Sequence, residues 1–306
     1  MSHTVGSGPS RLGLVAAFLT VYLCWGATFL ALRYVVAEIP PLLAVAARCA
    51  GGAAIVGGWL WWRGALVRPT AAEWWVTLGS GVLLFVGCHG VMAWAEVTVP
   101  SGEASVLMAT IPLWLVGFVG LAERRVPSRT TLAGLALGFG GVVLLSSRRD
   151  LGGEAGGLLE RVGLAGASAS WALGSLFGRR EPRLSTAQTM TMQLASGALT
   201  LVAVAAVSGS LVEWAAVRPG PRAVSGLGFL IVGGTVAGFG AYTWLLRVAS
   251  PAAAGSYAFV NPLVALLLAW VVGDGALTAP MLAAALAILA AVGLLRVGAA
   301  GRRRTA

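Results

Sequence analysis

The sequence predicts an all-α membrane protein whose ten transmembrane helices form two inverted five-helix repeats. Three observations support this fold class: the composition, the length of the apolar segments, and the similarity between the two halves. Of the 306 residues, 58% are hydrophobic and only 10% are charged. A soluble domain carries roughly 25% charged residues, so a chain this apolar could not cover itself with a polar surface.

Ten apolar segments are long enough to cross a bilayer as helices, which takes about 20 residues. They cover residues 12–32, 40–62, 75–96, 101–121, 130–147, 162–178, 187–207, 225–246, 252–272 and 278–297. Turn-forming residues separate the third from the fourth segment, at 100–102, and the ninth from the tenth, at 273–275. The first segment lacks a small-residue cleavage site, so we expect it to be retained as a helix.

The two halves of the chain resemble each other. Residues 47–53 resemble residues 192–198, residues 111–113 match residues 261–263, and Trp25 matches Trp171. We therefore expect a tail at 1–11, a first repeat at 12–147, a loop at 148–161, a second repeat at 162–297 and a basic tail at 298–306. An odd number of spans per repeat inverts the second copy. Inverted repeats are typical of secondary transporters, which bind substrate between the halves near the midplane.

The net charge of +10 comes from arginines in short loops. Placing the N-terminus in the cytoplasm puts most of them, including Arg302–Arg304, on the cytoplasmic side. Cytoplasmic loops carry the excess of basic residues. The sequence therefore predicts an inner-membrane protein with both termini in the cytoplasm, and it indicates topology signals rather than a nucleic-acid surface.

Pro112 and Pro262 are expected about half way along the fourth and ninth helices, as helix breaks. A proline inside a helix leaves the carbonyl four residues earlier without its amide partner, here that of Met108 or Ala258. Interrupted helices at equivalent positions of two repeats indicate a substrate site. The alternative is a packing kink without a role in binding.

Candidate functional residues among the ionisable side chains of the predicted spans are Arg48, His89, Glu96 and Glu103. Such residues in a membrane indicate function. His89, Glu96 and Glu103 are candidates for proton coupling, but His89 could instead bond a neighbouring carbonyl, Glu96 could lie at the interface, and Glu103 could stabilise a helix N-terminus. Arg48 could meet a substrate carboxylate or hold helix ends together.

Aromatic and amide side chains within the spans could form an amphipathic pocket wall with few polar groups. The residues concerned are Trp25, Phe29, Trp171, Tyr242, Tyr257 and Asn261. Any one of them could instead face lipid or pack in the bundle.

The remaining motifs point away from enzymes and cofactors. There is no P-loop, HExxH or GxSxG motif, and the three cysteines have no CxxC spacing. We therefore expect no metal, no cofactor and no catalysis, and any active transport must use an ion or substrate gradient. Gly134 and Gly138 form a GxxxG motif, which could support a homodimer or pack within the bundle.

The chain resembles the drug/metabolite transporter superfamily, in its EamA branch, over residues 12 to 297. The resemblance rests on residues 23–29, Arg48, 94–96, 100–102, Pro112, 170–175, 250–251 and 256–262. It implies export of small metabolites such as amino acids or drug-like compounds. It also implies a cavity lined by helices one, three, four, six, eight and nine, in agreement with the positions of Trp25, His89, Met108, Trp171, Tyr242 and Asn261. Relatives often carry Asn at the position of His89 and an apolar residue at that of Glu103.

The sequence thus predicts an alternating-access exporter of small amphipathic metabolites embedded in the lipid bilayer, with protons as a candidate coupling ion. An uncoupled facilitator of the same fold is the alternative. A membrane enzyme acting on lipids is a third hypothesis, which the lack of an acidic cluster disfavours.

Overall fold

The computed structural model describes residues 10–95, 98–99, 104, 107–146, 157–179, 183–215, 217–271 and 279–304. The first half contains α1 (Arg11–Val36), α2 (Pro41–Trp62), α3 (Ala71–Gly81), η1 (Val82–Gly90), α4 (Val91–Ala95), α6 (Ile111–Glu123) and α7 (Arg129–Ser146). The second half contains α8 (Leu158–Gly178), α9 (Thr186–Val207), α10 (Ser210–Ala215), α11 (Pro221–Phe229), η2 (Leu230–Phe239), α12 (Gly240–Val248), α13 (Pro251–Gly255), α14 (Tyr257–Val271) and α15 (Ala279–Arg304).

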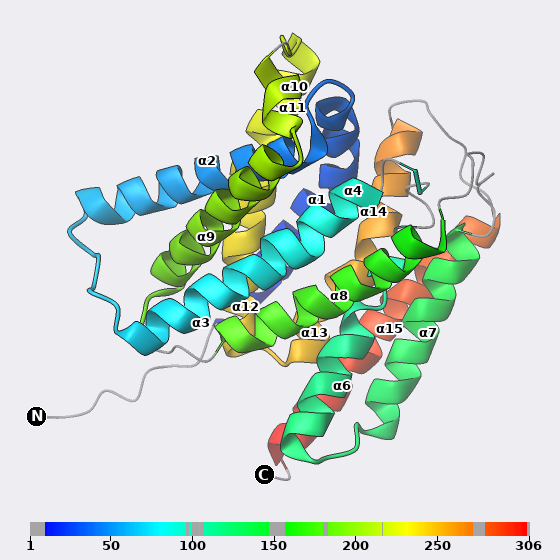
Figure 1. Ribbon diagram of the computed structural model, residues 1–306. Helices are drawn as coiled ribbons and strands as arrows, with labels where there is room; N and C mark the ends of the chain where they lie inside the picture. Colours follow the sequence, from blue (N-terminus) through cyan, green and yellow to red (C-terminus); the bar gives the residue numbers. More distant parts are fainter. Residues whose placement is uncertain are drawn as a thin grey trace, which may run out of the picture.

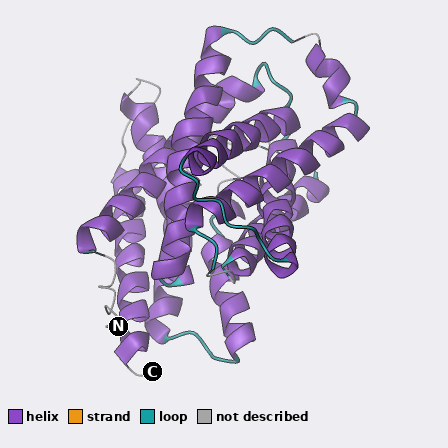
Figure 2. Cartoon of the chain, turned by 90° about the vertical axis from the view of Figure 1, so that its left-hand side faces the viewer, coloured by secondary structure: helices purple, strands orange, loops and turns teal. Residues whose placement is uncertain are grey.

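Each predicted span overlaps one of these helices or a run of them, and helices fill both views of the molecule (Figures 1 and 2). Among the described residues, five helices are long and apolar enough to cross a membrane: Arg11–Val36, Pro41–Trp62, Ala71–Ala95, Thr186–Val207 and Pro221–Val248. Large apolar side chains are exposed on the outer surface of the bundle, among them Leu19, Trp75, Leu199, Val232 and, on α15, Leu286. An exposed apolar surface of this extent suits lipid.

Local sequence signals explain where several helices begin. Ser10, Ser185 and Ser250 each accept a hydrogen bond from the backbone amide three residues later, at 3.0, 3.1 and 3.2 Å. Thr70 and Glu73 form a reciprocal capping box at the start of α3. Such caps satisfy amides that have no partner inside the helix.

The halves pack as a pseudo-symmetric pair (Figure 1). Equivalent helices contact each other, α2 with α9 and α7 with α15. Other helices pack on the opposite half in matching pairs. α1 packs on α14 and η2 of the second half, and its equivalent α8 packs on α6 and η1 of the first half. The first helix begins and the last helix ends on the same side of the bundle (Figures 1 and 2). We call this side the terminal face, and the opposite side, where α1 ends and α2 begins, the α1–α2 face.

Two glycines also make matching close contacts with a helix of the opposite half. A Cβ atom on Gly52 of α2 would lie 2.6 Å from Cγ2 of Thr235 in η2, and one on Gly197 of α9 would lie 2.5 Å from Cβ of Phe85 in η1. These two glycines occupy matching places in the segments that the sequence comparison aligned. Because only glycine allows such close helix approach, the seam between the halves depends on both positions.

The third and eighth spans are long helices, Ala71–Ala95 and Pro221–Val248, and each contains a π-helical segment in its middle. These segments are η1, between α3 and α4, and η2, between α11 and α12. In each segment a side chain contacts the carbonyl five residues earlier, His89 Nδ1 to Leu84 at 3.1 Å and Thr235 Oγ1 to Leu230 at 2.9 Å. The sequence did not predict these segments. π-Helical turns occur frequently at functional sites.

The two predicted proline breaks have different outcomes. Pro112 is the second residue of α6, directly after a turn at residues 109–110, so the chain is interrupted beside it. Pro262 lies inside α14, which continues through it, so the predicted break at Pro262 is wrong. The interruption lies instead at Ser256, whose hydroxyl donates to the Ala253 carbonyl at 2.7 Å and pairs with the Tyr22 hydroxyl at 2.7 Å. The local bond to Ala253 and the tertiary contact with Tyr22 together stabilise a break that proline alone does not cause.

The GxxxG glycines Gly134 and Gly138, and Gly141 one turn further along α7, pack inside the bundle. Cβ atoms on Gly134 and Gly141 would meet side chains of Leu295 and Ile288 on α15, and one on Gly138 would meet Phe259 on α14. The glycine face of α7 is therefore buried against the last two helices of the same chain.

Candidate substrate-binding site

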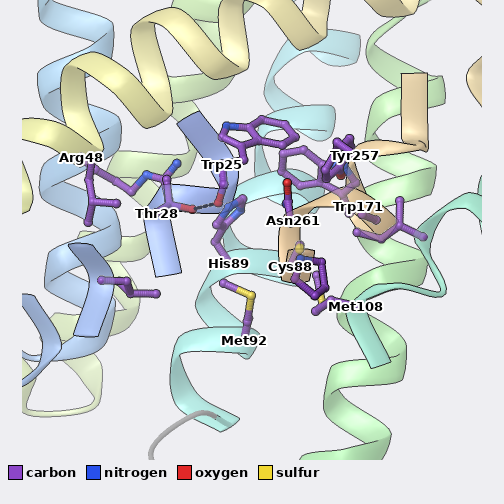
Figure 3. Close-up of a pocket in the computed structure, with 15 residues that line it drawn as sticks. Trp25, Thr28, Arg48, Cys88, His89, Met92, Met108, Trp171, Tyr257 and Asn261 are labelled. Carbon is purple, nitrogen blue, oxygen red and sulfur yellow. Dashed lines mark hydrogen bonds between the residues drawn. The ribbon is translucent and has the colours of Figure 1, made fainter. Parts of the chain in front are cut away.

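A large cavity lies at the seam of the two halves (Figure 3). It holds about 730 Å³ of space free of protein atoms, including space that is open to solvent. Its walls come from α1, α2, η1, α4, α8, η2 and α14 together with residues 108 and 111 of the fourth span. The lining residues are Trp25, Thr28, Leu32, Arg48, Cys88, His89, Met92, Met108, Ile111, Trp171, Leu230, Tyr257, Ala258, Asn261 and Pro262.

The structure brings most of the predicted binding residues to this cavity. Six of them line it: Trp25, His89, Met108, Trp171, Tyr257 and Asn261. Tyr242 is not among its lining residues and lies beneath it, against Trp171. Glu96, Glu103 and the side chain of Phe29 lie outside the part of the chain that the structure describes.

Several lining residues were not predicted, among them Thr28, Cys88 and Met92. Helical spacing offers a signal for two of them, because Thr28 lies three residues after Trp25 and Met92 three residues after His89. Cys88 offers no such signal, since adjacent residues of an α-helix do not share a face.

Four aromatic rings from α1, α8, α12 and α14 pack together at the base of the cavity, and three of them, Trp25, Trp171 and Tyr257, line it. The Trp25 ring lies at the centre, with centroid distances of 5.6 Å to Trp171, 5.1 Å to Tyr242 and 4.5 Å to Tyr257. Edge-on and tilted ring pairs of this kind are favourable beyond their buried area. We call Trp25, Trp171, Tyr242 and Tyr257 the aromatic floor.

Hydrogen bonds tie the aromatic floor, including Trp25 of the first half, to helices of the second half. Trp25 Nε1 donates to the Gly234 carbonyl at 2.8 Å, and Trp171 Nε1 donates to the Tyr242 hydroxyl at 3.2 Å. The Tyr242 hydroxyl in turn donates to Ser175 Oγ at 2.8 Å. Because Trp25 and Trp171 occupy matching positions of the repeats, the floor lies on the pseudo-symmetry axis.

Among the described residues of the cavity wall, Arg48 is the charged one. Its side chain is 6% exposed, and its Nε donates to Thr235 Oγ1 at 3.2 Å. No carboxylate of the described residues pairs with it. The terminal nitrogens of the guanidinium group therefore remain available to a ligand.

His89 stands beside the floor, with its ring 5.0 Å from Trp171 and 5.6 Å from Phe85. Its Nδ1 contacts the Leu84 carbonyl, which can only accept a hydrogen bond, so Nδ1 carries a proton. In the neutral ring, Nε2 is then an acceptor. The hydrogen bond to a neighbouring carbonyl, one of the two expectations for His89, is therefore present, and the ring also lines the cavity.

Asn261 is buried in the cavity wall with an unsatisfied amide oxygen. The residue is 8% exposed, and its Oδ1 has no hydrogen-bond partner. A buried polar atom without a partner costs about 1–3 kcal/mol. In Figure 3 the amide lies between His89 and Tyr257, so a molecule in the cavity could satisfy it.

A small cavity of about 280 Å³ lies on the other side of the aromatic floor, towards the terminal face. Its lining residues are Leu84, Ser175, Gly178, Arg179, Gln193, Phe239, Tyr242, Thr243, Leu246 and Arg247. Gln193, which the repeat aligns with Arg48, donates through Nε2 to Ser80 Oγ at 2.8 Å and leaves its Oε1 without a partner. The two cavities are thus pseudo-symmetric counterparts of different size.

Polar contacts between the halves close the terminal face below the small cavity. Arg183 forms an ion pair with the buried Glu73 and donates to the Arg68 carbonyl at 3.0 Å. Gln188 Nε2 donates to the Val67 carbonyl at 2.5 Å and its Oε1 accepts from the Val67 amide at 3.1 Å. These contacts join α3 and the loop before it to the segment that begins α9.

The site contains no metal centre that the described residues could form, since no three His, Cys, Asp or Glu side chains among them are placed to hold an ion.

Comparisons with known proteins agree with this architecture. A model of the EamA-like transporter family matches residues 11–147 and, a second time, residues 161–297. The "Uncharacterized inner membrane transporter YedA" of Escherichia coli K12 is 31% identical over 262 residues, which are 84% of this chain and 82% of that protein. The "Uncharacterized transporter YvbV" of Bacillus subtilis 168 is 24% identical over 306 residues, covering 97% of this chain and 95% of the relative.

A solved structure, named only "Crystal structure of protein", has the same fold. It superposes with a TM-score of 0.78 over 97% of this chain and 100% of its own length, at 22% sequence identity.

Proposed function

Because the chain belongs to the EamA-like transporter family and is a membrane transporter, we propose that it exports small amphipathic metabolites by alternating access. The substrate binds in the large cavity above the aromatic floor. The repeats at residues 12–147 and 162–297 then rock around that site, so that the large cavity contracts as the small cavity expands.

The observation that carries this proposal is the pair of unequal cavities on the two sides of one aromatic floor. Packing contacts between the halves occur in exchanged pairs. Each half can therefore adopt the packing of the other at similar cost, which makes the mirror state, with the small cavity expanded, an accessible second conformation. A substrate that fits both states would cross without an open channel.

In this proposal the charge distribution gives the side of the membrane that each cavity faces. With the arginine-rich loops in the cytoplasm, both termini are cytoplasmic and the large cavity faces outward. The polar contacts of Glu73 and Gln188 then form the closed cytoplasmic gate. The substrate enters from the cytoplasm when this gate opens and leaves through the α1–α2 face.

A proton is the coupling ion in this proposal, and His89 is its carrier. The ring lies on the cavity wall and keeps one nitrogen free to exchange a proton with a bound molecule or with water. An uncoupled facilitator would use the same cavity without protonation of His89.

The first experiment measures efflux from liposomes that contain the purified protein and are loaded with a panel of labelled metabolites. Trp25→Leu, which removes the central ring of the floor, is expected to abolish efflux. Trp75→Leu, on the exposed surface of α3, is the matched control and is expected to retain it. If no solute leaves faster than from liposomes with the Trp25→Leu protein, the proposal is wrong.

The second experiment tests alternation with single cysteines in a cysteine-free background, Thr28→Cys in the large cavity and Leu246→Cys in the small one. Substrate is expected to change their reactivity towards a membrane-impermeant thiol reagent in opposite directions, each from its own side. Labelling of both from the same side would contradict alternating access.

A further inference from the structure

We infer that the large cavity selects a monoanion: a small acid with one carboxylate group on an apolar body, held by Arg48. This inference rests on the proposed function and names the substrate class of its site. It distinguishes such acids from neutral amphipathic compounds and from zwitterions.

The first step is the state of the Arg48 side chain. Arg48 lies seven residues into α2, about 10 Å along the helix from Pro41. Only Nε has a hydrogen bond among the described residues, and no described carboxylate neutralises the charge. A buried arginine presents five donors in a planar fork, which matches the two oxygens of a carboxylate. An anion in the cavity would therefore supply the partner that the protein does not.

The second step is the charge balance of the whole wall. The described lining residues are apolar, aromatic or neutral except for Arg48, and His89 is already engaged through Nδ1. A guest with one negative charge neutralises the one cation of the described wall, that of Arg48. A zwitterion would also have to strip the water from its ammonium group, for which the described wall offers ring faces and the amide oxygen of Asn261, but no carboxylate. In a medium of low dielectric this difference favours the acid.

The third step is the role of Asn261. Its amide is buried and has an oxygen without a partner. Rotation of the amide exchanges its oxygen with its NH₂ group, so it can accept from a hydroxyl of the guest or donate to a second oxygen. The aromatic floor and Met92, Met108 and Leu230 then hold the apolar body. The cavity is thus complementary to a molecule with an acid group, a hydrogen-bonding group and an apolar ring or chain.

The test compares three probes that share one ring: phenylacetate, phenylacetamide and phenylalanine. They carry a charge of −1, no charge, and a balanced pair of charges. Binding to purified protein in detergent is followed by the change in intrinsic fluorescence of the twelve tryptophans, which include Trp25 and Trp171 of the floor, and by the rise in melting temperature. We expect phenylacetate to bind at least tenfold more tightly than either of the other two.

Arg48→Gln is expected to remove this preference, so that phenylacetate and phenylacetamide bind with similar affinity. Arg48→Lys is expected to keep the preference at reduced strength, and it provides a second variant if Arg48→Gln does not fold. Arg63→Gln, at the exposed end of α2, is the matched control and is expected to leave all three affinities unchanged.

The outcomes separate this inference from the proposed function, because binding is measured without transport. Tight, Arg48-dependent binding of phenylacetate in a protein that moves no solute would support the anion site and contradict the transport proposal. Binding of phenylacetamide or phenylalanine at the affinity of phenylacetate would overturn the inference even in an active transporter. Failure of phenylacetate to bind, or the same preference in Arg48→Gln as in the wild type, would also overturn it.

Discussion

Replacing Tyr242 with phenylalanine is expected to open the small cavity to the terminal face. The substitution removes one hydroxyl, which donates to Ser175 Oγ and accepts from Trp171 Nε1, and leaves the packing of the ring unchanged. Each hydrogen bond contributes about 0.5–1.5 kcal/mol net. Both bonds join α8 to α12 in the closed state and are absent once these helices separate. Their loss therefore lowers the stability of the closed state by about 1–3 kcal/mol relative to the opened state, and the population of the opened state rises about 5- to 150-fold.

The assay measures the labelling rate of a cysteine at position 246, in a chain whose three native cysteines have been replaced. Leu246 lines the small cavity and is buried while that cavity is closed. When the opened state is a minor one, its labelling rate is proportional to its population. The rate is therefore expected to rise by the same factor as the population, from the side of the terminal face.

Two controls separate gate opening from general loosening. A cysteine at Thr28, in the large cavity, is expected to react no faster in the Tyr242→Phe protein than in the parent. Tyr34→Phe removes a hydroxyl from an exposed ring on α1 and is expected to leave both rates unchanged. An unchanged rate at position 246, or an equal rise at both positions, would refute the assignment of Tyr242 as a latch.

Three further predictions concern other parts of the site. Gly238→Ala is expected to abolish transport, because the added Cβ would lie 2.6 Å from Nε1 of Trp25. Gly228→Ala adds a Cβ in open space and is expected to stay active in the same efflux assay. Glu73→Gln weakens the ion pair between the halves and is expected to lower the melting temperature, whereas Glu123→Gln is expected to leave it unchanged. His89→Asn is expected to retain substrate exchange but to lose the effect of a pH gradient on efflux; an effect of wild-type size would exclude His89 as the proton carrier.

The membrane-spanning fold was predictable because the bilayer requires a continuous apolar stretch of sequence for each helix that crosses it. A helix that crosses lipid needs a long apolar segment, and such a segment is visible without knowledge of its neighbours. The repeat was visible for the same reason, since matching residues such as Trp25 and Trp171 recur in order. The π-helical segments η1 and η2 were not predictable, because their shifted hydrogen bonds depend on the helices that pack against them.

The incorrect break at Pro262 and the undecided role of Arg48 have a common cause. Both depend on contacts with distant residues: the hydroxyl of Tyr22 stabilises the break at Ser256, and Thr235 anchors the Arg48 side chain across 187 residues of sequence. A local rule can indicate that a proline or a charge in a span needs a partner. It cannot identify that partner, which here decides where the helix bends and where the guanidinium points.

One position of the repeat contributes a polar side chain to the cavity on each side of the aromatic floor. Arg48 on α2 and Gln193 on α9 occupy matching places, and each anchors itself to the central helix of the other half, through Thr235 and Ser80. One contributes a cation to the large cavity, and the other contributes a neutral amide to the small cavity. If the halves exchange their packing during transport, the two states share an aromatic floor but place their cations differently, because the small cavity is lined by Arg179 and Arg247 and has Gln193 at the place that matches Arg48. The repeat therefore supplies the motion, and the difference between Arg48 and Gln193 makes the two states unequal at this one position.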